Sequence, residues 1–162
     1  MQGVALGGFM GVGKSSVGRA LAARLGLPFV DTDAVLAQRH GPVAEQIARS
    51  GEAAFRAREH ALVEELARGP EAVVATGGGL WVDPRNRAAL RRWGKLVVLQ
   101  APLEVLAARV GAGEGRPLWD DDVAARYAAR QPAYADADLV VDTVGRTIDG
   151  IVEEIAAWRA GS

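Results

Sequence analysis

The sequence predicts an α/β fold in which a parallel β-sheet is flanked by helices. Short apolar runs alternate along the chain with longer segments whose apolar residues recur at helical spacing, and this alternation is typical of such sheets. The first apolar run leads into the segment GFMGVGKS at residues 8–15, and a helical pattern follows it. A length of 162 residues suits one domain with one substantial core. We therefore expect residues 1–162 to form a single domain.

Five apolar runs are expected to form the strands, because each is short and bounded by turn residues. They lie near Val4–Phe9, Phe29–Asp31, Ala72–Thr76, Leu96–Gln100 and Leu139–Asp142. Helices are expected near Lys14–Leu25, Asp33–His40, Val43–Ser50, Glu52–Arg68, Pro84–Arg92, Leu103–Val110, Asp121–Gln131 and Thr147–Arg159. Open sheets of this kind bind ligands at the carboxyl ends of their strands. The residues that follow each strand are therefore the candidate site.

Composition narrows the class of protein. The formal net charge of −1 argues against a general binder of nucleic acids or membrane surfaces. There is no cysteine, which excludes disulfides and thiolate chemistry and is compatible with a reducing compartment. No signal peptide is visible, and no stretch is apolar for the length that a bilayer needs. We expect a cytoplasmic monomer with no nucleic-acid or membrane partner.

The segment GFMGVGKS matches the phosphate-binding loop G-x-x-x-x-G-K-S. Its glycines let the chain curl so that backbone N–H groups point at phosphate oxygens. The Lys14 ammonium can reach the β- and γ-phosphates of a nucleotide, the Ser15 hydroxyl can bind Mg²⁺, and the following helix directs the positive end of its dipole at the same anion. Lys14 is one of only two lysines in the chain, which argues against a chance match to the motif. Nucleotide phosphates are expected at Gly11, Val12, Gly13, Lys14, Ser15 and Ser16.

Two carboxylates follow the second predicted strand. In an extended segment Asp31 and Asp33 point the same way, so both would face one cleft. Carboxylates near nucleotide phosphates can hold Mg²⁺ through its waters or accept a hydrogen bond from a substrate hydroxyl. Asp33 could instead be the N-cap of the following helix, and the two roles could coexist.

Three glycines follow the third predicted strand. Gly77, Gly78 and Gly79 would let the backbone pass close to a ligand and offer bare N–H groups, although a flexible turn is the simpler interpretation. Three glycines in a row favour the ligand-facing role. Trp81, just after them, is a candidate to line the same pocket, whereas the only tyrosines, Tyr127 and Tyr134, are assigned to packing.

Three arginines stand out by their neighbours. Arg56 lies near the start of a predicted helix, Arg116 lies in a glycine-rich segment that could close as a lid, and Arg130 lies near the end of another helix. Arginine binds carboxylates and phosphates bidentately. The chain is rich in arginine, so composition does not choose among these three.

Taken together, these segments resemble the shikimate kinase family over nearly the whole chain. The motifs that carry the resemblance, in this order, are GFMGVGKSSVGR (8–19), FVDTD (29–33), FRARE (55–59), TGGG (76–79), GRPL (115–118) and ARQPAY (129–134). The resemblance implies a P-loop kinase three-layer sandwich with a five-stranded parallel sheet in the order 2-3-1-4-5. It also implies an acceptor-binding region at about 33–60 and a mobile lid at about 111–121.

The activity implied by the resemblance is a Mg²⁺- and ATP-dependent phosphorylation of the shikimate 3-hydroxyl. The products would be shikimate 3-phosphate and ADP, in the biosynthesis of aromatic amino acids. Asp33 would hydrogen-bond the hydroxyls of the acceptor and act as its base. Arg56 and Arg130 would clamp the shikimate carboxylate, helped by the backbone of Gly77, Gly78 and Gly79.

On the nucleotide side, the resemblance implies that Lys14, Asp33 and Arg116 are the catalytic groups. Asp31 would act on Mg²⁺ through water, beside Ser15 as the direct ligand. Arg116 would swing over the transferring phosphates. Two further arginines, Arg109 and Arg146, fall where the family packs arginine near the adenine.

Two other functions remain open at this point. A related small-molecule kinase, such as a gluconate kinase, would share the phosphate loop and the lid, but it would not need Arg56, the triple glycine and Arg130 together. A non-catalytic nucleotide-binding module would be expected to have lost Lys14, one of the aspartates or the lid arginine, and the sequence keeps them all.

Overall fold

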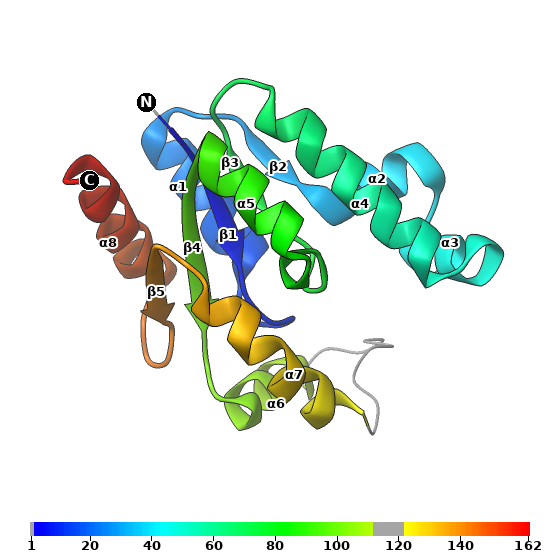
Figure 1. The fold of residues 1–162 in the computed structure, drawn as a ribbon. Helices are drawn as coiled ribbons and strands as arrows, with labels where there is room; N and C mark the ends of the chain where they lie inside the picture. Colours follow the sequence, from blue (N-terminus) through cyan, green and yellow to red (C-terminus); the bar gives the residue numbers. More distant parts are fainter. Residues whose placement is uncertain (1, 112–121) are drawn as a thin grey trace.

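The protein is built around a parallel five-stranded sheet (Figure 1). The computed structural model describes residues 2–111 and 122–162. The strands are β1 (Gly3–Gly7), β2 (Phe29–Asp31), β3 (Val73–Ala75), β4 (Gly94–Gln100) and β5 (Leu139–Asp142). Their order across the sheet is β2-β3-β1-β4-β5, and each neighbouring pair is parallel. The predicted sheet order is confirmed.

Helices cover both faces of this sheet (Figure 1). They are α1 (Lys14–Leu25), α2 (Thr32–His40), α3 (Val43–Ser50), α4 (Glu52–Ala67), α5 (Pro84–Trp93), α6 (Leu103–Gly111), α7 (Val123–Ala135) and α8 (Ile148–Ala160). A short 3-10 helix, η1 (Leu80–Val82), precedes α5. Helices α1 and α8 pack together behind the sheet in Figure 1, whereas α5 lies in front of it. The three-layer architecture follows from this arrangement.

The central strands are buried on both faces. Every residue of β1 is buried, and Leu96 to Leu99 of β4 are at most 1% exposed. This explains why the sequence there is a continuous apolar run rather than an alternating one. A smaller apolar cluster is formed by Leu36 of α2 with Phe55 and Leu62 of α4, separate from the main core.

Strand β4 begins two residues earlier than predicted, at Gly94, and two predicted C-terminal ends are wrong for local reasons. Strand β1 ends at Gly7 rather than at Phe9, because Gly8 has a φ of 143° that a strand does not allow. Helix α7 was expected to end at Gln131 but continues through Pro132 to Ala135. Proline removes one backbone donor, and packing of the last turn against η1 keeps the helix intact.

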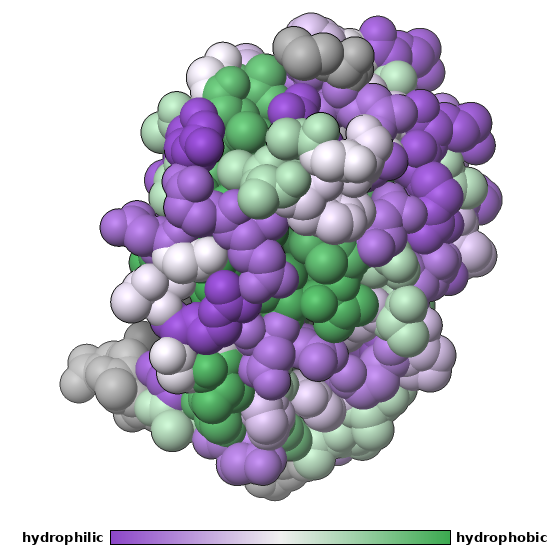
Figure 2. All heavy atoms as spheres, turned by 90° about the vertical axis from the view of Figure 1, so that its left-hand side faces the viewer, coloured by the Kyte–Doolittle hydropathy of each residue, from purple (hydrophilic) through white to green (hydrophobic). Residues whose placement is uncertain are grey.

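The surface beside α8 and β5 is mainly hydrophilic, with apolar atoms in separate small areas (Figure 2). Exposed apolar residues include Val140 on β5, and Val144 and Ile148 before and in α8. Within residues 2–111 and 122–162, no helix combines the length and apolar character needed to cross a bilayer.

Candidate active site

The phosphate-binding loop lies at the carboxyl end of the central strand β1, where α1 begins. Gly13 has a φ of 101° and is the N-cap of α1, so Lys14 is the first helical residue. Phe9 and Val12 are buried in the main core and hold the loop down. The loop therefore leads directly into the N-terminus of α1, where the unpaired amides of the first turn suit an anion.

Lys14 is half-buried in this loop, and its Nζ donates a hydrogen bond to the carbonyl oxygen of Gly8. Burial lowers the pKa of Lys14 to about 8, with a smaller contribution from Arg130, while Asp33 and Asp31 act in the opposite direction. A phosphate placed here would favour the charged ammonium and so raise this pKa.

Asp31 connects the phosphate loop with α2. Its Oδ2 accepts a hydrogen bond of 3.0 Å from the Ser15 hydroxyl. Its Oδ1 accepts bonds from the backbone N–H of Asp33 at 3.0 Å and of Ala34 at 3.2 Å, so Asp31 is the N-cap of α2. The expectation that Asp33 could be this cap is wrong, because Asp33 already lies in the first turn.

A hydroxyl and a carboxylate in contact beside the phosphate loop suit Mg²⁺. This ion prefers oxygen ligands and keeps several of its waters, so it does not need a cage of side chains. In the described part of the chain, no group of three or more histidine, aspartate or glutamate side chains could hold a metal ion. The pair of Ser15 and Asp31 is the candidate magnesium site.

Asp33 opens toward solvent at the mouth of the same cleft. A side chain on Gly77 would lie 2.5 Å from Oδ1 of Asp33, so the carboxylate lies directly against the triple glycine. Partial removal of the carboxylate from water raises the pKa of Asp33, and the charge of Asp31 adds to this effect. The charges of Lys14 and Arg56 oppose it. A raised pKa suits a group that accepts a proton and later releases it.

A cavity of about 420 Å³ lies beside this cleft. Two of the expected arginines, Arg56 from α4 and Arg130 from α7, meet there over the triple-glycine turn. A side chain on Gly79 would lie 2.4 Å from Nη1 of Arg56, and one on Gly78 would lie 2.8 Å from Nη1 of Arg130. The described residues that line the cavity are Glu52, Arg56, Glu59, Gly79, Val82, Asp83, Asn86, Arg126, Ala129 and Arg130.

Glu59 is a member of this site to which the sequence analysis gave no role. It is 1% exposed, and its Oε1 lies 2.6 Å from Nη1 of Arg56. Burial raises the pKa of Glu59, while Arg56 opposes the shift. The signal was the spacing F-R-x-x-E, since residues three apart lie on one face of a helix.

Trp81 does not line the acceptor cavity, so that expectation is wrong. Its side chain is fully buried, and its Nε1 donates a hydrogen bond of 3.0 Å to the carbonyl oxygen of Ala133 in α7. Gly7 at the end of β1 makes room for the ring, because a Cβ there would lie 2.5 Å from it. Trp81 therefore joins η1 to the last turn of α7.

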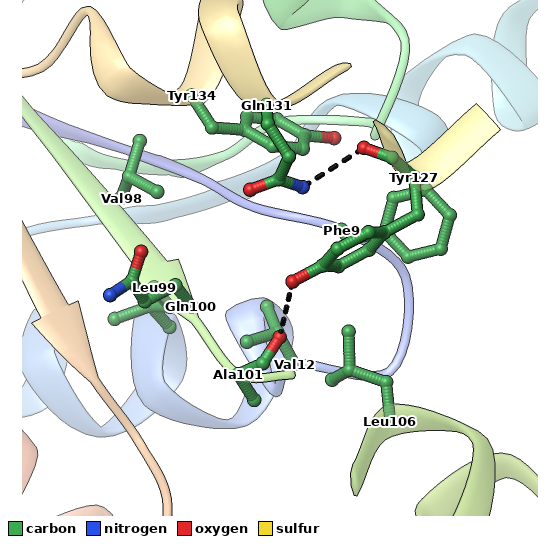
Figure 3. Close-up of a pocket in the computed structure, with 10 residues that line it drawn as sticks. All are labelled: Phe9, Val12, Val98, Leu99, Gln100, Ala101, Leu106, Tyr127, Gln131 and Tyr134. Carbon is green, nitrogen blue, oxygen red and sulfur yellow. Dashed lines mark hydrogen bonds between the residues drawn. The ribbon is translucent and has the colours of Figure 1, made fainter. Parts of the chain in front are cut away.

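A second cavity, of only about 10 Å³, lies behind the phosphate loop (Figure 3). Phe9 and Tyr127 meet there edge to face, with ring centroids 5.2 Å apart, and the Tyr127 hydroxyl donates to the carbonyl oxygen of Ala101 at 2.9 Å. This space is too small for a nucleotide or an acceptor, so it is a gap in the packing.

The two arginines expected near the adenine lie close to the same short segment after β5. Nη1 of Arg109 donates to the hydroxyl of Thr143 at 3.4 Å, and the backbone N–H of Arg146 donates to the carbonyl oxygen of Thr143 at 3.3 Å. The side chain of Arg146 also pairs with Glu154 of α8. Arg116 and, apart from Gly111 at the end of α6, the lid expected at about 111–121 lie outside the described residues.

A glycine loop that joins a central parallel strand to a helix, with lysine and serine at the start of that helix, defines a P-loop nucleotide-binding protein. A family model described as shikimate kinase matches residues 10–159. A shikimate kinase of Geobacter sulfurreducens is 45% identical over 161 residues, which cover 96% of this chain and 89% of that protein. The chain therefore belongs to the shikimate kinase family and is an ATP-dependent small-molecule kinase.

Solved structures agree with this assignment. The shikimate kinase from Acinetobacter baumannii in complex with shikimate has a TM-score of 0.88 at 30% identity, covering 98% of this chain and 92% of that one. A gluconokinase from Sinorhizobium meliloti has a TM-score of 0.69 at 25% identity, covering 98% of this chain and 91% of that one. The shikimate kinase is thus the more similar of the two, and the family assignment is favoured over the gluconate alternative.

Proposed function

We propose that this chain transfers the γ-phosphoryl group of ATP to the 3-hydroxyl of shikimate, giving shikimate 3-phosphate and ADP. The observation that carries the proposal is the meeting of Asp33, Arg56 and Arg130 over one triple-glycine turn, beside Lys14. In this arrangement Asp33 can accept hydrogen bonds from substrate hydroxyls, and the two arginines can bind a carboxylate, next to a phosphate site. A small anionic polyol needs these groups together.

The acceptor binds by its two kinds of oxygen. Its carboxylate lies between the guanidinium groups of Arg56 and Arg130, which can each bind it bidentately. Gly79 lines the same cavity, and the amides of Gly78 and Gly79 assist. The ring hydroxyls donate to Asp33, whose raised pKa lets it take the proton of the attacking hydroxyl.

The phosphoryl group is held in a cationic environment. Loop amides between Gly11 and Ser16 bind the phosphates, except that of Val12, which donates to the carbonyl oxygen of Phe9 at 3.2 Å. Lys14 places a positive charge beside the β- and γ-phosphates. The Ser15 hydroxyl, and Asp31 through water, would hold Mg²⁺, which would neutralise part of the phosphate charge. Arg116 completes this environment, and Arg109 and Arg146 contact the adenine.

A coupled assay of ADP release tests the proposal, with MgATP and either shikimate, gluconate or no acceptor. Release that depends on shikimate is expected. Release with gluconate alone would keep the phosphate site and move the acceptor to the related kinase class. Omitting Mg²⁺ is expected to abolish turnover, which checks the metal. We also propose a cytoplasmic monomer with one P-loop domain, and light scattering after size-exclusion chromatography tests the oligomeric state.

A further inference from the structure

The triple-glycine turn is held from both sides by buried hydroxyl groups. The backbone N–H of Gly77 donates to Oγ1 of Thr32 at 2.9 Å. The Tyr134 hydroxyl donates to the carbonyl oxygen of Gly78, also at 2.9 Å. Thr32 is fully buried and Tyr134 is 5% exposed. Two neighbouring residues of one flexible segment are thus tied to two different elements, α2 and α7.

Each hydroxyl belongs to an element that also carries a proposed site residue. Thr32 directly precedes Asp33, whose carboxylate lies against Gly77. Tyr134 lies one helical turn after Arg130 on α7, and the Arg130 guanidinium lies against Gly78. The turn therefore contacts both the proposed base, Asp33, and one of the two carboxylate-binding arginines, Arg130.

Neither Thr32 nor Tyr134 belongs to the described lining of the acceptor cavity. Burial raises the pKa of Tyr134 to about 12, so its hydroxyl stays a donor across the physiological range. The hydroxyl of Thr32 accepts from the backbone and lies under the turn. Neither group lines the cavity. Thr32 can therefore influence the acceptor only through the backbone of Gly77, whereas Tyr134 holds the carbonyl of Gly78 and also hydrogen-bonds Arg130.

We propose that Thr32 and Tyr134 are positioning residues that fix the spacing between Asp33 and Arg130 in the acceptor pocket. This inference rests on the proposed function. Glycine has no side chain to limit its backbone, so three in a row would sample many orientations unless their peptide groups were held. A consequence is that the N–H of Gly77 is already engaged, which leaves those of Gly78 and Gly79 to assist the carboxylate.

The first test removes one hydroxyl. Tyr134→Phe keeps the ring, and we expect the KM for shikimate to rise about ten-fold while the KM for ATP changes by less than about two-fold. Tyr127→Phe is the matched control, because Tyr127 lies on the same helix and also donates to a backbone carbonyl, that of Ala101 (Figure 3). We expect that control to leave the KM for shikimate unchanged.

The second test separates positioning from packing. Thr32→Val keeps the shape and removes the acceptor of the Gly77 N–H, so it should raise the KM for shikimate as Tyr134→Phe does. Thr32→Ser restores the hydroxyl and should restore the KM. In an Arg130→Ala background, Tyr134→Phe should add less than about a two-fold change, because the clamp that it positions is gone.

Three results would overturn the inference. These are an unchanged KM for shikimate in both Tyr134→Phe and Thr32→Val, an equal rise in both substrates' KM, or a Thr32→Ser variant that behaves as Thr32→Val. Calorimetric titration with shikimate provides a readout independent of turnover. A wild-type chain that neither binds nor phosphorylates shikimate would instead overturn the proposed function, and the inference with it.

Discussion

Nη1 of Arg56 lies 2.6 Å from Oε1 of Glu59, whose side chain is only 2% exposed. A second carboxylate, Glu52, approaches Nη2 of Arg56 at 3.3 Å, but its side chain is 69% exposed. Buried charge-assisted hydrogen bonds orient a guanidinium more strongly than exposed ones, which water screens. Glu59 therefore sets the direction in which Arg56 enters the acceptor cavity, and Glu52 adds little.

Glu59→Gln is expected to raise the KM for shikimate about ten-fold, because the amide keeps the size of the side chain but loses its charge. The KM for ATP should change by less than about two-fold, since Arg56 lies on the acceptor side. Glu52→Gln is the matched comparison and should change either KM by less than about two-fold. Steady-state kinetics with each substrate varied measures this. Equal effects of the two variants would contradict the role given to Glu59.

Asp31→Asn is expected to lower kcat by about 10- to 100-fold and to raise the Mg²⁺ concentration needed for half-maximal rate. Asparagine can still accept the N–H bonds at the start of α2, so the melting temperature should change little. Thr147→Ala provides the contrast, because Thr147 caps α8 by accepting from the N–H of Gly150. That variant should lose about 1 kcal/mol of unfolding free energy and keep its Mg²⁺ dependence. A loss of stability in Asp31→Asn without a change in Mg²⁺ dependence would mean that Asp31 is only a cap.

The sheet and the phosphate loop could be predicted because their signals are local. Each strand is one apolar run, and the loop is one contiguous motif whose glycines, lysine and serine have separate physical roles. The boundary errors at Phe9 and Pro132 concern one turn each. At the end of β1 the conformation of Gly8 overrode the apolar pattern, and at the end of α7 the packing of the helix overrode the effect of Pro132.

The hydrogen bonds that hold the site residues in place could not be predicted from the sequence in the same way. The bonds from Gly77 to Thr32, from Tyr134 to Gly78 and from Trp81 to Ala133 join residues that are 45, 56 and 52 positions apart. No periodicity or motif encodes such a pairing, because it depends on how α2, η1 and α7 are placed by the whole fold. A buried tyrosine that packs and one that positions a turn look alike in sequence.

The affinity for nucleotide is expected to fall as the pH rises above about 8. In the free protein Lys14 has a pKa of about 8, lowered by burial. Bound phosphates favour the ammonium, so the complex keeps its proton at a pH where the free protein has lost it, and binding takes up a proton. Calorimetric titration with ADP from pH 6.5 to 9.5, in buffers of different ionisation enthalpy, measures both effects.

Two arginine variants control for this pH dependence. Lys14→Arg should remove the inflection near pH 8, since arginine stays protonated throughout. Lys95→Arg should keep it, because Lys95, the other lysine, lies over the ring of Trp158 and away from the site. An inflection that persists in Lys14→Arg would assign it to another group.

Gly79→Ala is expected to weaken shikimate binding with little effect on stability, whereas Gly7→Ala is expected to lower stability. Gly79 has a φ of −84° and a ψ of −17°, which alanine adopts without strain, and the nearest atoms to its added methyl would be those of the Arg56 guanidinium. That group ends a flexible side chain, so it can move aside by weakening its bond to Glu59. The KM for shikimate should then rise by about ten-fold or more, with the unfolding free energy changed by less than about 1 kcal/mol.

At Gly7 the added methyl would meet the ring of Trp81 at 2.5 Å. The ring is fully buried and tied to Ala133, so it cannot move aside without disturbing the packing between β1, η1 and α7. Overpacking of this kind should lower the unfolding free energy by about 1–3 kcal/mol. Urea denaturation and steady-state kinetics on both variants make the comparison. A Gly79→Ala protein that unfolds as easily as Gly7→Ala would show that Arg56 is held too rigidly to yield, which would make the clamp part of the framework of the fold.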